Sequence, residues 1–385
     1  MFIFSKRLLL FAASCVLVNC SLVAGKTVKI DSEQFFFQSS QKSAEQEDAS
    51  AQCDLAYCYE FGVGTAKDLE KAFKWLKKSA DQGYAESQSH LGYCYEYGIG
   101  TEKDLPKAFE WYKKAAELGY AIAQYRLGCC YYNGNGVAKN LKMAFEWYKK
   151  SAKQGHSTSQ YNLGLCYQQG VGIEKNLGKA FNWFKKSAYQ EYVVAQYKLG
   201  YFYYTGIGMD KDLEKAFEWF KKSAKHGLVQ AQCFLGLCYK QGSGVKKDFK
   251  KAFEWYKKSA EQGYAVAQYN LGLCYQQGTG TKENLKKSFE WYKKSAEQGY
   301  AFAQYNLGCC YWDGLGTKIN LQKAVEWYGK AANQGCAEAQ YNLGIYYFNQ
   351  GQNLQAYKFF EEAASQGEAY AQNMLNKYYK EQYKE

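Results

Sequence analysis

The sequence has almost no proline and very few histidines. Its 385 residues include one Pro and three His, beside 36 Gly, 38 Tyr and 14 Cys. Such a biased composition indicates one motif copied many times. The histidines, His90, His156 and His226, lie far apart and show neither a metal-ligand spacing nor a catalytic pairing. The sequence therefore predicts no metal site, no cofactor, no catalytic residue and no enzymatic activity.

Long apolar runs are also missing. Beyond the N-terminus no segment approaches the roughly 20 apolar residues that a membrane-spanning helix needs. At the N-terminus, Lys6 and Arg7 precede a short apolar run over residues 8–18, with small residues near Ala24, which predicts a signal peptide over residues 1–25. The stretch LVNC resembles a lipoprotein cleavage box, so a lipid anchor on Cys20 is an alternative to simple cleavage. We expect an exported protein, either secreted, periplasmic or held in the cell envelope, without a transmembrane segment.

The charge excess is mild. A net charge of +12 over 385 residues is weaker than nucleic-acid binding domains usually carry, so we expect no nucleic-acid partner. Paired glycines such as Gly170 and Gly172 lack the preceding strand and the third glycine of a phosphate-binding loop. The composition and motifs thus leave a repeat protein as the main interpretation.

One motif recurs every 36 residues. The stretch FEWYKKSAEQGYA occurs twice without a change, starting at Phe253 and at Phe289. The glutamine of a recurring A-x-A-Q-Y-x-L-G phrase follows the same period: Gln52, Gln88, Gln124, Gln160, Gln196, Gln232, Gln268, Gln304 and Gln340. Nine copies in one register predict a repeat architecture.

Each copy reads as a helical hairpin. In residues 121–156, apolar side chains at Ala123, Leu127 and Cys130 have the spacing of one buried face, which predicts a first helix, helix A. Gly134 ends it, because glycine accepts the left-handed conformation. A second helix, helix B, follows with its own apolar face, and Gly155 closes it. Short oxygen-bearing side chains predict the N-cap of helix B in eight copies: Asp68, Asp104, Asn140, Asn176, Asp212, Asp248, Asn284 and Asn320.

One hairpin cannot bury its own apolar face, but a stack can. We therefore predict an all-α protein, a right-handed α/α solenoid of nine 36-residue helical hairpins with half-repeat caps. We expect tryptophans to fill the seams between repeats. The expected organisation is a signal peptide (1–25), a linker and N-terminal capping helix (26–48), nine repeats (49–368) and a C-terminal capping helix (369–385).

The repeated phrase resembles the Sel1-like repeat, a tetratricopeptide-related α/α solenoid. Residues 301–335 match its pattern almost throughout, including Leu307, Gly314 and Trp327, and the resemblance covers roughly residues 31–384. Two departures are Glu191, which replaces the closing glycine, and a shortened loop near Gly351. The resemblance implies a non-catalytic scaffold, often exported in bacteria, that binds a protein or peptide partner, including host proteins. We expect a monomer.

Some cysteine-rich relatives imply an alternative, a hydrolase acting on cell-wall or β-lactam-like substrates. Ser39-x-x-Lys42 and Ser243-x-x-Lys246 match one signature of penicillin-recognising enzymes, but its companion motifs are absent. The relatives staple their helices with paired cysteines, whereas helix B contains none here. Seven cysteines instead share one position of helix A: Cys58, Cys94, Cys130, Cys166, Cys238, Cys274 and Cys310. Equivalent positions in stacked repeats lie about 10 Å apart, beyond the roughly 7 Å of a disulfide, which favours free thiols over a disulfide framework.

Lys-Lys pairs recur in helix B from Lys77-Lys78 to Lys293-Lys294. They allow a second alternative, in which a row of positive charge binds a polyanion or an acidic membrane surface. Glutamates such as Glu146 and Glu218, three and four residues ahead of the lysines, favour a solvated helix face instead.

A candidate binding surface follows from the variation between copies. The positions equivalent to 122, 126, 129 and 133 lie along one stripe of helix A, opposite the core residue Leu127, and the 126-type position changes from charged to aromatic along the chain. In related solenoids helix A lines the concave face, so this helix A stripe is expected to form the floor of a ligand-binding groove. The candidate ligand-binding residues are Arg126, Asn162, Lys198, Tyr201, Phe234, Leu237, Asn270, Phe302, Asn306 and Asn342.

Overall fold

The computed structural model describes residues 32–382, which fold into helices joined by short turns without any strand. The predicted signal peptide and Cys20 lie outside these residues. The helices are α2 (Ser32–Glu45), α3 (Ala49–Phe61), α4 (Leu69–Asp81), α5 (Ala85–Tyr97), α6 (Leu105–Glu117), α7 (Ala121–Asn133), α8 (Leu141–Lys153), α9 (Ser157–Gln169), α10 (Leu177–Tyr189), α11 (Val193–Thr205), α12 (Leu213–Lys225), α13 (Val229–Gln241), α14 (Phe249–Glu261), α15 (Ala265–Gln277), α16 (Leu285–Glu297), α17 (Ala301–Asp313), α18 (Leu321–Ala332), α19 (Ala337–Asn349), α20 (Asn353–Ser365) and α21 (Ala369–Gln382). The predicted all-α hairpin architecture is confirmed.

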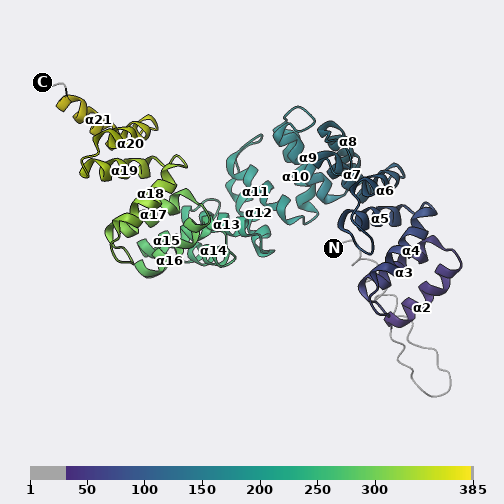
Figure 1. Ribbon diagram of the computed structural model, residues 1–385. Coiled ribbons are helices and arrows are strands. Elements are labelled where there is room, and N and C mark those ends of the chain that lie inside the picture. The colour runs from purple at the N-terminus through teal and green to yellow at the C-terminus, as the bar shows by residue number, and fades with distance from the viewer. Residues whose placement is uncertain (1–31, 383–385) are drawn as a thin grey trace, which may run out of the picture. The chain divides into compact units, whose positions relative to one another are not determined.

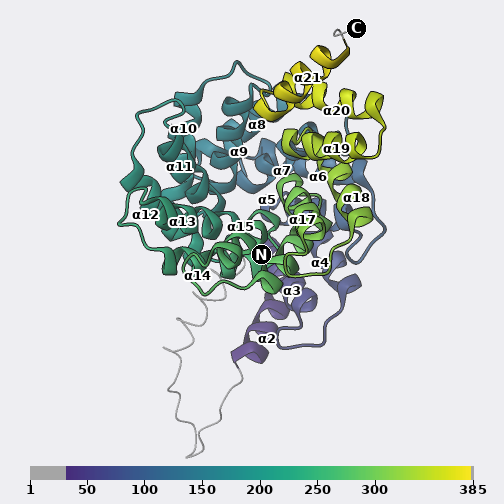
Figure 2. The same cartoon turned by 90° about the vertical axis from the view of Figure 1, so that its left-hand side faces the viewer.

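The helices group into two units, residues 1–190 and residues 191–385. Unit 1 contains the described helices α2–α10 and unit 2 contains α11–α21. Within each unit, every helix A packs most extensively on helix B of its own hairpin and then on helix B of the preceding one. Figures 1 and 2 show this succession of antiparallel pairs from two directions.

The helix ends follow the predicted signals. Asn140 accepts a hydrogen bond from the backbone N–H of Met143 (3.0 Å), and the same contact recurs at all eight predicted N-caps. Gly134 ends α7 with a φ of 82°, in the left-handed region. Glu191, which replaces a closing glycine, adopts this region too, with a φ of 62°. Residues 350–352 join α19 to α20, a connection four residues shorter than residues 314–320 of the preceding hairpin.

Within a hairpin, a glycine of helix A faces a large ring of helix B. A Cβ on Gly164 would lie 2.7 Å from two ring carbons of Phe184, a separation that packed atoms do not tolerate. The same pairing recurs from Gly92 with Tyr112 to Gly344 with Phe360. The first hairpin departs from it, because Ala56 and Leu76 occupy these positions and both are buried. The missing Cβ is thus matched to the size of the opposing side chain.

Neighbouring hairpins are joined by aromatic contacts. Phe145 of α8 meets Tyr167 of α9 edge-on, with ring centroids 5.4 Å apart and an interplanar angle of 90°. Five further Phe–Tyr pairs between described hairpins repeat this geometry, and Phe37 of α2 makes the same contact with Tyr59 (5.6 Å, 89°). The tryptophans add to the seam, as predicted: Trp147 is buried against the cluster of the hairpin before it.

Buried glutamines also link the hairpins. Gln124 donates to the carbonyl of Ala116 in the preceding helix B (3.2 Å) and accepts from Gln154 at the end of its own helix B (2.8 Å). A glutamine with both bonds satisfies a helix-end carbonyl and holds three helices together. In the sequence these residues served only as markers of the period, and their role in packing was not anticipated.

The glutamine ladder is interrupted where helix B does not end with glutamine. Gln88 still donates to the Ala80 carbonyl (3.1 Å), but the equivalent of Gln154 is Leu118, and the buried Oε1 of Gln88 has no hydrogen-bond partner. Leu118 is itself 60% exposed. A buried acceptor without a partner costs about 1–3 kcal/mol.

We therefore expect Leu118→Gln to stabilise the protein by about 1 kcal/mol, because it supplies the missing donor and removes exposed apolar surface. The measurement is urea unfolding of the mature chain, with Glu117→Gln as a neighbouring control that supplies no such donor. An unchanged or lower midpoint for Leu118→Gln would contradict the role given to the ladder.

Candidate interaction surface on the A helices

The structure places the predicted binding residues outside the core, on the helix A stripe. Nine of the ten are half-buried, and Phe302 is 51% exposed. Their surroundings differ between the two units. Residue types at the stripe positions vary between repeats for two reasons: some of these side chains contact the neighbouring repeat, and others lie on open surface.

In unit 1 polar side chains on and beside the stripe pair between successive repeats. His90 Nε2 lies 2.9 Å from a carboxylate oxygen of Glu60, and the Arg126 guanidinium lies 3.8 Å from Glu96. Tyr112 also donates to Glu96 (2.6 Å). Arg126 further stacks on the ring of Tyr93, 5.1 Å from its centroid. These contacts stabilise the stack and leave Arg126 only partly available to a ligand. Asn162 lies half-buried on α9.

In unit 2, Phe234 is the centre of an aromatic cluster. Its ring stacks on Phe220 at 5.1 Å and meets Tyr197, Tyr201 and Tyr204 at 5.6–6.0 Å. Tyr201 and Phe234 are thus brought together. Much of the ring surface of Phe234 is used in packing, so its substitution would disturb the stack.

Other candidate residues of unit 2 are more scattered. Phe302 belongs to α17 and contacts Tyr269 and Tyr300, with centroids 6.3 and 5.7 Å away. No described contact joins it to Phe234. Leu237 is half-buried on α13, and burial lowers the pKa of Lys198 on α11.

Asn270, Asn306 and Asn342 occupy the 126-type position of α15, α17 and α19. The Asn270 amide donates to the backbone carbonyl of Val266 in its own helix (2.8 Å). Burial raises the pKa of Tyr292, and hydrogen bonds, including one from Asn306, partly offset the effect. Asn342 acts in the same way on Tyr328. The Asn270 side chain is thus held by its own helix.

The buried tyrosines of helix B give a matched pair of tests in unit 2. Tyr292 donates to Gln276 (2.6 Å), whereas the buried hydroxyl of Tyr256 has no hydrogen-bond partner. We expect Tyr292→Phe to cost about 1–2 kcal/mol, because it removes a bond to a half-buried amide. Tyr256→Phe should be neutral or stabilising by up to about 1 kcal/mol. Urea unfolding of both variants is the measurement, and equal losses would contradict the assignment.

One histidine lies beside serines, a contact that was not predicted from the sequence. His156 Nδ1 and Ser159 Oγ are 2.7 Å apart, Ser159 donates to Ser151 (2.7 Å), and Ser151 donates to the Ala121 carbonyl (2.6 Å). Both serines are fully buried between the helices. A substrate cannot reach them in this structure, so the chain of hydrogen bonds serves the stacking of repeats. His156 and Ser159 lie three positions apart at the start of α9, so their spacing was an available signal.

The serines of the penicillin-recognising signature have no such neighbours. Ser39 donates to the carbonyl of Phe36 in its own helix (3.1 Å), and Ser243 donates to Gln241 (3.3 Å). These contacts give neither hydroxyl a base that would activate it as a nucleophile.

The described cysteines are free thiols, and most are buried. The seven cysteines of the shared helix A position all lie in the core, which agrees with the thiol interpretation of the sequence. Burial raises the pKa of Cys58, Cys94, Cys130, Cys238 and Cys310 from an ordinary 9.0 to about 12.

These thiols predict a loss of stability in alkali. The unfolded chain gives up their protons near pH 9, while the folded chain keeps them to about pH 12. Their contribution is therefore complete below pH 9 and is lost as the pH rises toward 12. We expect the free energy of unfolding to fall over this range, and to fall less steeply in Cys238→Ala. Urea titrations at several alkaline pH values test this, and parallel slopes for both proteins would contradict it.

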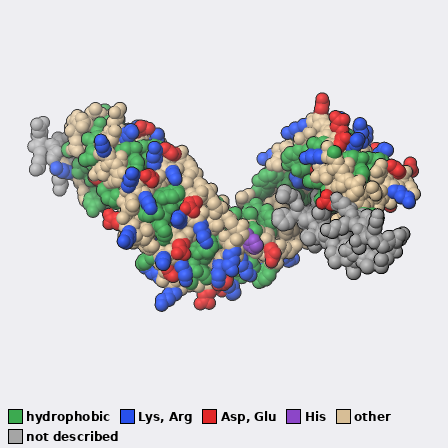
Figure 3. Space-filling model, turned by 90° about the horizontal axis from the view of Figure 1, so that it is seen from below, with side chains coloured by type: hydrophobic (Ala, Val, Ile, Leu, Met, Phe, Trp, Pro, Cys, Tyr) green, Lys and Arg blue, Asp and Glu red, His purple; other side chains and the backbone are tan. Residues whose placement is uncertain are grey.

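The recurring lysines face solvent along helix B. The second lysine of each pair lies over the tryptophan three residues before it, with the ammonium 3.9 Å from the Trp147 ring centroid in the case of Lys150 and 4.4 Å from Trp219 in the case of Lys222. First lysines make ion pairs, such as Lys149 with Glu146 at 3.5 Å. Figure 3 shows Lys and Arg interspersed with acidic and apolar side chains over the visible face. The arrangement favours a solvated helix face over a polyanion site.

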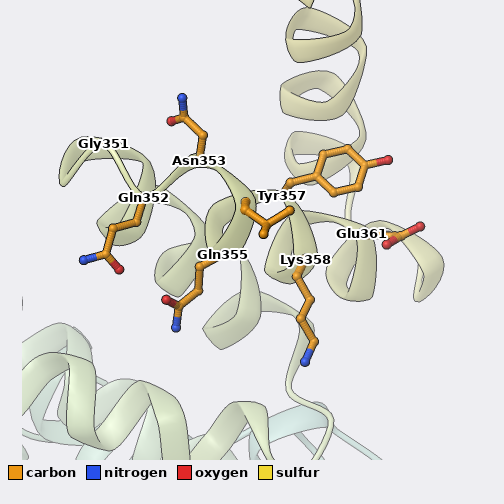
Figure 4. A pocket seen from close by; sticks show the side chains of 8 residues that line it. Gly351, Gln352, Asn353, Gln355, Tyr357, Lys358 and Glu361 are labelled. Carbon is orange, nitrogen blue, oxygen red and sulfur yellow. The ribbon is translucent and has the colours of Figure 1, made fainter.

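A surface hollow of about 850 Å³ lies at the shortened connection between α19 and α20. It is lined by Gly351, Gln352, Asn353, Leu354, Gln355, Tyr357, Lys358 and Glu361. Figure 4 shows that the polar side chains diverge from the ribbon instead of converging on one point. Convergent polar groups are what a small-molecule site requires, so the hollow is not a candidate ligand site.

Membrane spans and metal clusters are both missing from the described part of the chain. No helix among residues 32–382 is long and apolar enough to span a bilayer. No group of three or more potential metal ligands is found within the same residues.

Stacked hairpins of two short helices, repeated every 36 residues and joined by glycine–ring and glutamine contacts, define an α/α solenoid. Comparison with known families gives the class its name. The Sel1 repeat model matches nine consecutive segments: 49–84, 85–120, 121–156, 157–192, 193–228, 229–264, 265–300, 301–336 and 337–368. The chain belongs to the Sel1 repeat family.

Solved structures show the same fold. One is c5321, described as a protective antigen of uropathogenic Escherichia coli with an SLR fold; it is 37% identical, with a TM-score of 0.79 over 88% of this chain and 73% of that one. A Sel1 repeat protein from Oxalobacter formigenes is 35% identical, with a TM-score of 0.59 over 63% of this chain and 96% of that one. A search of curated protein sequences gives no significant match. Sel1 repeat solenoids are in general non-catalytic scaffolds for protein–protein interaction.

Proposed function

We propose that this protein is an exported, non-catalytic Sel1 repeat scaffold that binds a peptide or protein segment along the helix A stripe. The observation that carries the proposal is the contrast between constant packing positions and this half-exposed, variable stripe. The partner is a protein of the same cell or of a host. Export rests on the predicted signal peptide, either with simple cleavage or with a lipid anchor on Cys20.

The binding residues fall into two groups by their surroundings. In unit 1, Arg126 pairs with Glu96 and Asn162 lies half-buried on the same stripe. In unit 2, Tyr201 and Phe234 contact each other, and Lys198 and Leu237 are half-buried on the stripe. Also in unit 2, Asn270, Asn306 and Asn342 offer half-buried amide groups and Phe302 an exposed ring. Phe302 and Asn306 share one helix four residues apart, so both can contact the same ligand residue.

The test is selection of binders from a random-peptide display library on the mature chain, residues 26–385. Selected peptides are then measured against Phe302→Ala combined with Asn306→Ala, and against Gln322→Ala as a control on the exposed face of α18. We expect binding to fall in the first variant and to stay constant in the second, with unchanged helicity by circular dichroism. Peptides that bind both equally would place the site elsewhere.

A further inference from the structure

Four aromatic rings lie on the helix A stripe of the first two repeats, in unit 1. Tyr57 and Phe61 of α3 have ring centroids 4.7 Å apart, and Tyr93 and Tyr97 of α5 have centroids 4.6 Å apart. Phe61 is 53% exposed and Tyr97 is 55% exposed. In every later repeat the residue equivalent to Phe61 is polar. These four rings, here called the N-terminal aromatic patch, thus distinguish this end of the stripe.

The patch lies in an acidic part of a basic chain. Neither α3 nor α5 contains a Lys or Arg, and their acidic residues are Asp54, Glu60, Glu86 and Glu96, although the chain has a net charge of +12. Asp54 precedes Tyr57 by three residues and Glu86 precedes Tyr93 by seven, spacings that place each pair on one helix face. A basic ligand is therefore attracted to this part of a molecule whose overall charge repels it.

The chain's own Arg126 shows which cation suits this surface. From α7 its guanidinium lies 5.1 Å from the centroid of the Tyr93 ring and 3.8 Å from a carboxylate oxygen of Glu96. A guanidinium is planar and weakly hydrated, so it stacks on aromatic faces more readily than the compact, strongly hydrated ammonium of lysine. Phe61 and Tyr97 offer solvent-exposed ring surface of the same kind in the same acidic part of the chain.

We propose that the N-terminal aromatic patch binds the arginine side chains of a peptide or protein segment, with Phe61 and Tyr97 as the rings on which the guanidinium groups stack. The carboxylates of Asp54 and Glu86 attract the segment through opposite charge. The patch shares no residue with the candidate binding residues on α7–α19. The inference therefore goes beyond the proposed function, and each can fail without the other.

The probe is a fluorescein-labelled peptide of alternating Arg and Ser, measured by fluorescence anisotropy with the mature chain. A Lys-Ser peptide of the same length is the control for charge alone. Each cation–π contact at an exposed site is worth roughly a two- to fivefold change in affinity. We therefore expect Phe61→Leu combined with Tyr97→Leu to weaken binding of the Arg-Ser peptide roughly tenfold. Tyr97→Phe, which keeps the ring, should leave the affinity unchanged. Leucine retains apolar bulk and favours helix, so circular dichroism should show the helicity of the parent.

A preference for the Arg-Ser peptide that is lost in the double leucine variant supports the inference. Equal binding of the Arg-Ser and Lys-Ser peptides, equal binding to parent and leucine variant, or no binding to the parent would overturn it.

The variant Phe302→Ala, Asn306→Ala separates the inference from the proposed function. It should bind the Arg-Ser peptide as the parent does, and a loss of binding there would place the peptide on α17 and overturn the inference. If library-selected peptides depend on Phe302 and Asn306 while the Arg-Ser peptide does not bind, the inference is wrong and the proposed function stands.

Discussion

Replacing Gly244 with alanine should cost unit 2 about 3–4 kcal/mol of stability. Gly244 has a φ of 69°, where a side chain costs about 1–2 kcal/mol, and a Cβ there would collide with the Leu213 carbonyl and lie 2.8 Å from the Glu214 nitrogen. Both contacts are backbone atoms of the preceding hairpin, which cannot rotate away. The collision is relieved only if the two hairpins move apart, which costs about 1–3 kcal/mol, as is typical of overpacking.

Gly263→Ala is the matched control for this effect. Gly263 also has a positive φ, of 90°, but no atom of another residue lies within 4 Å of the position that an added Cβ would take. It should cost only the conformational strain, about 1–2 kcal/mol. Urea unfolding of both variants gives the difference, and equal losses would show that the close approach between hairpins contributes nothing.

The second large effect concerns the glycine–ring pairs inside each hairpin. Gly164→Ala should destabilise the protein by about 2 kcal/mol, because the new methyl group collides with the buried Phe184 ring at 2.7 Å. Phe184→Leu alone should cost about 1–2 kcal/mol through the space it leaves. The double variant recreates the Ala–Leu pair that the first hairpin uses at Ala56 and Leu76.

We expect the double variant to be more stable than the sum of the single losses by at least about 1 kcal/mol. Residues in contact couple in this way, whereas independent sites add. The measurement is a double-mutant cycle by urea unfolding, with unfolding slopes compared to detect loss of two-state behaviour in the repeat array. Strict additivity would contradict the size matching described for the hairpins.

Much of the architecture could be predicted from sequence because it depends on local signals. The 36-residue period fixes the hairpins, side-chain oxygens such as that of Asn140 fix the start of helix B, and Gly134 fixes the end of helix A. These contacts lie within a few residues of chain. Because each signal recurs in several repeats, the assignment of the helices does not depend on any single segment.

Contacts between helix ends were not predicted. Gln124 was recognised only as a marker of the period, since its role depends on a carbonyl eight residues away at the end of another helix and on a partner amide at Gln154. A signal was present, because a glutamine at a buried helical face in nine copies needs a partner. Leu118 and His226 stand where other repeats have the partner glutamine. The buried side-chain oxygens of Gln88 and Gln196 accordingly accept no hydrogen bond.

The stripe could be located from sequence, but its chemistry could not. Variation alone does not distinguish a ligand contact from a pair of residues that contact each other in adjacent repeats. The pairs Glu60 with His90 and Glu96 with Arg126 are each 30 positions apart, and a glutamate at that fixed offset before a His or Arg was the available signal. Phe234 was an attractive ligand contact in sequence, yet its ring packs against four others. Phe302 and Asn306 are therefore the better sites for substitution.

The measurement that tests the central claim most directly is the affinity of library-selected peptides for the mature chain and for its Phe302→Ala, Asn306→Ala variant. The account predicts that binding falls in the variant while its helicity by circular dichroism stays that of the parent. Selected peptides that bind parent and variant alike, or a library that yields none, would contradict the claim that this stripe is the working surface.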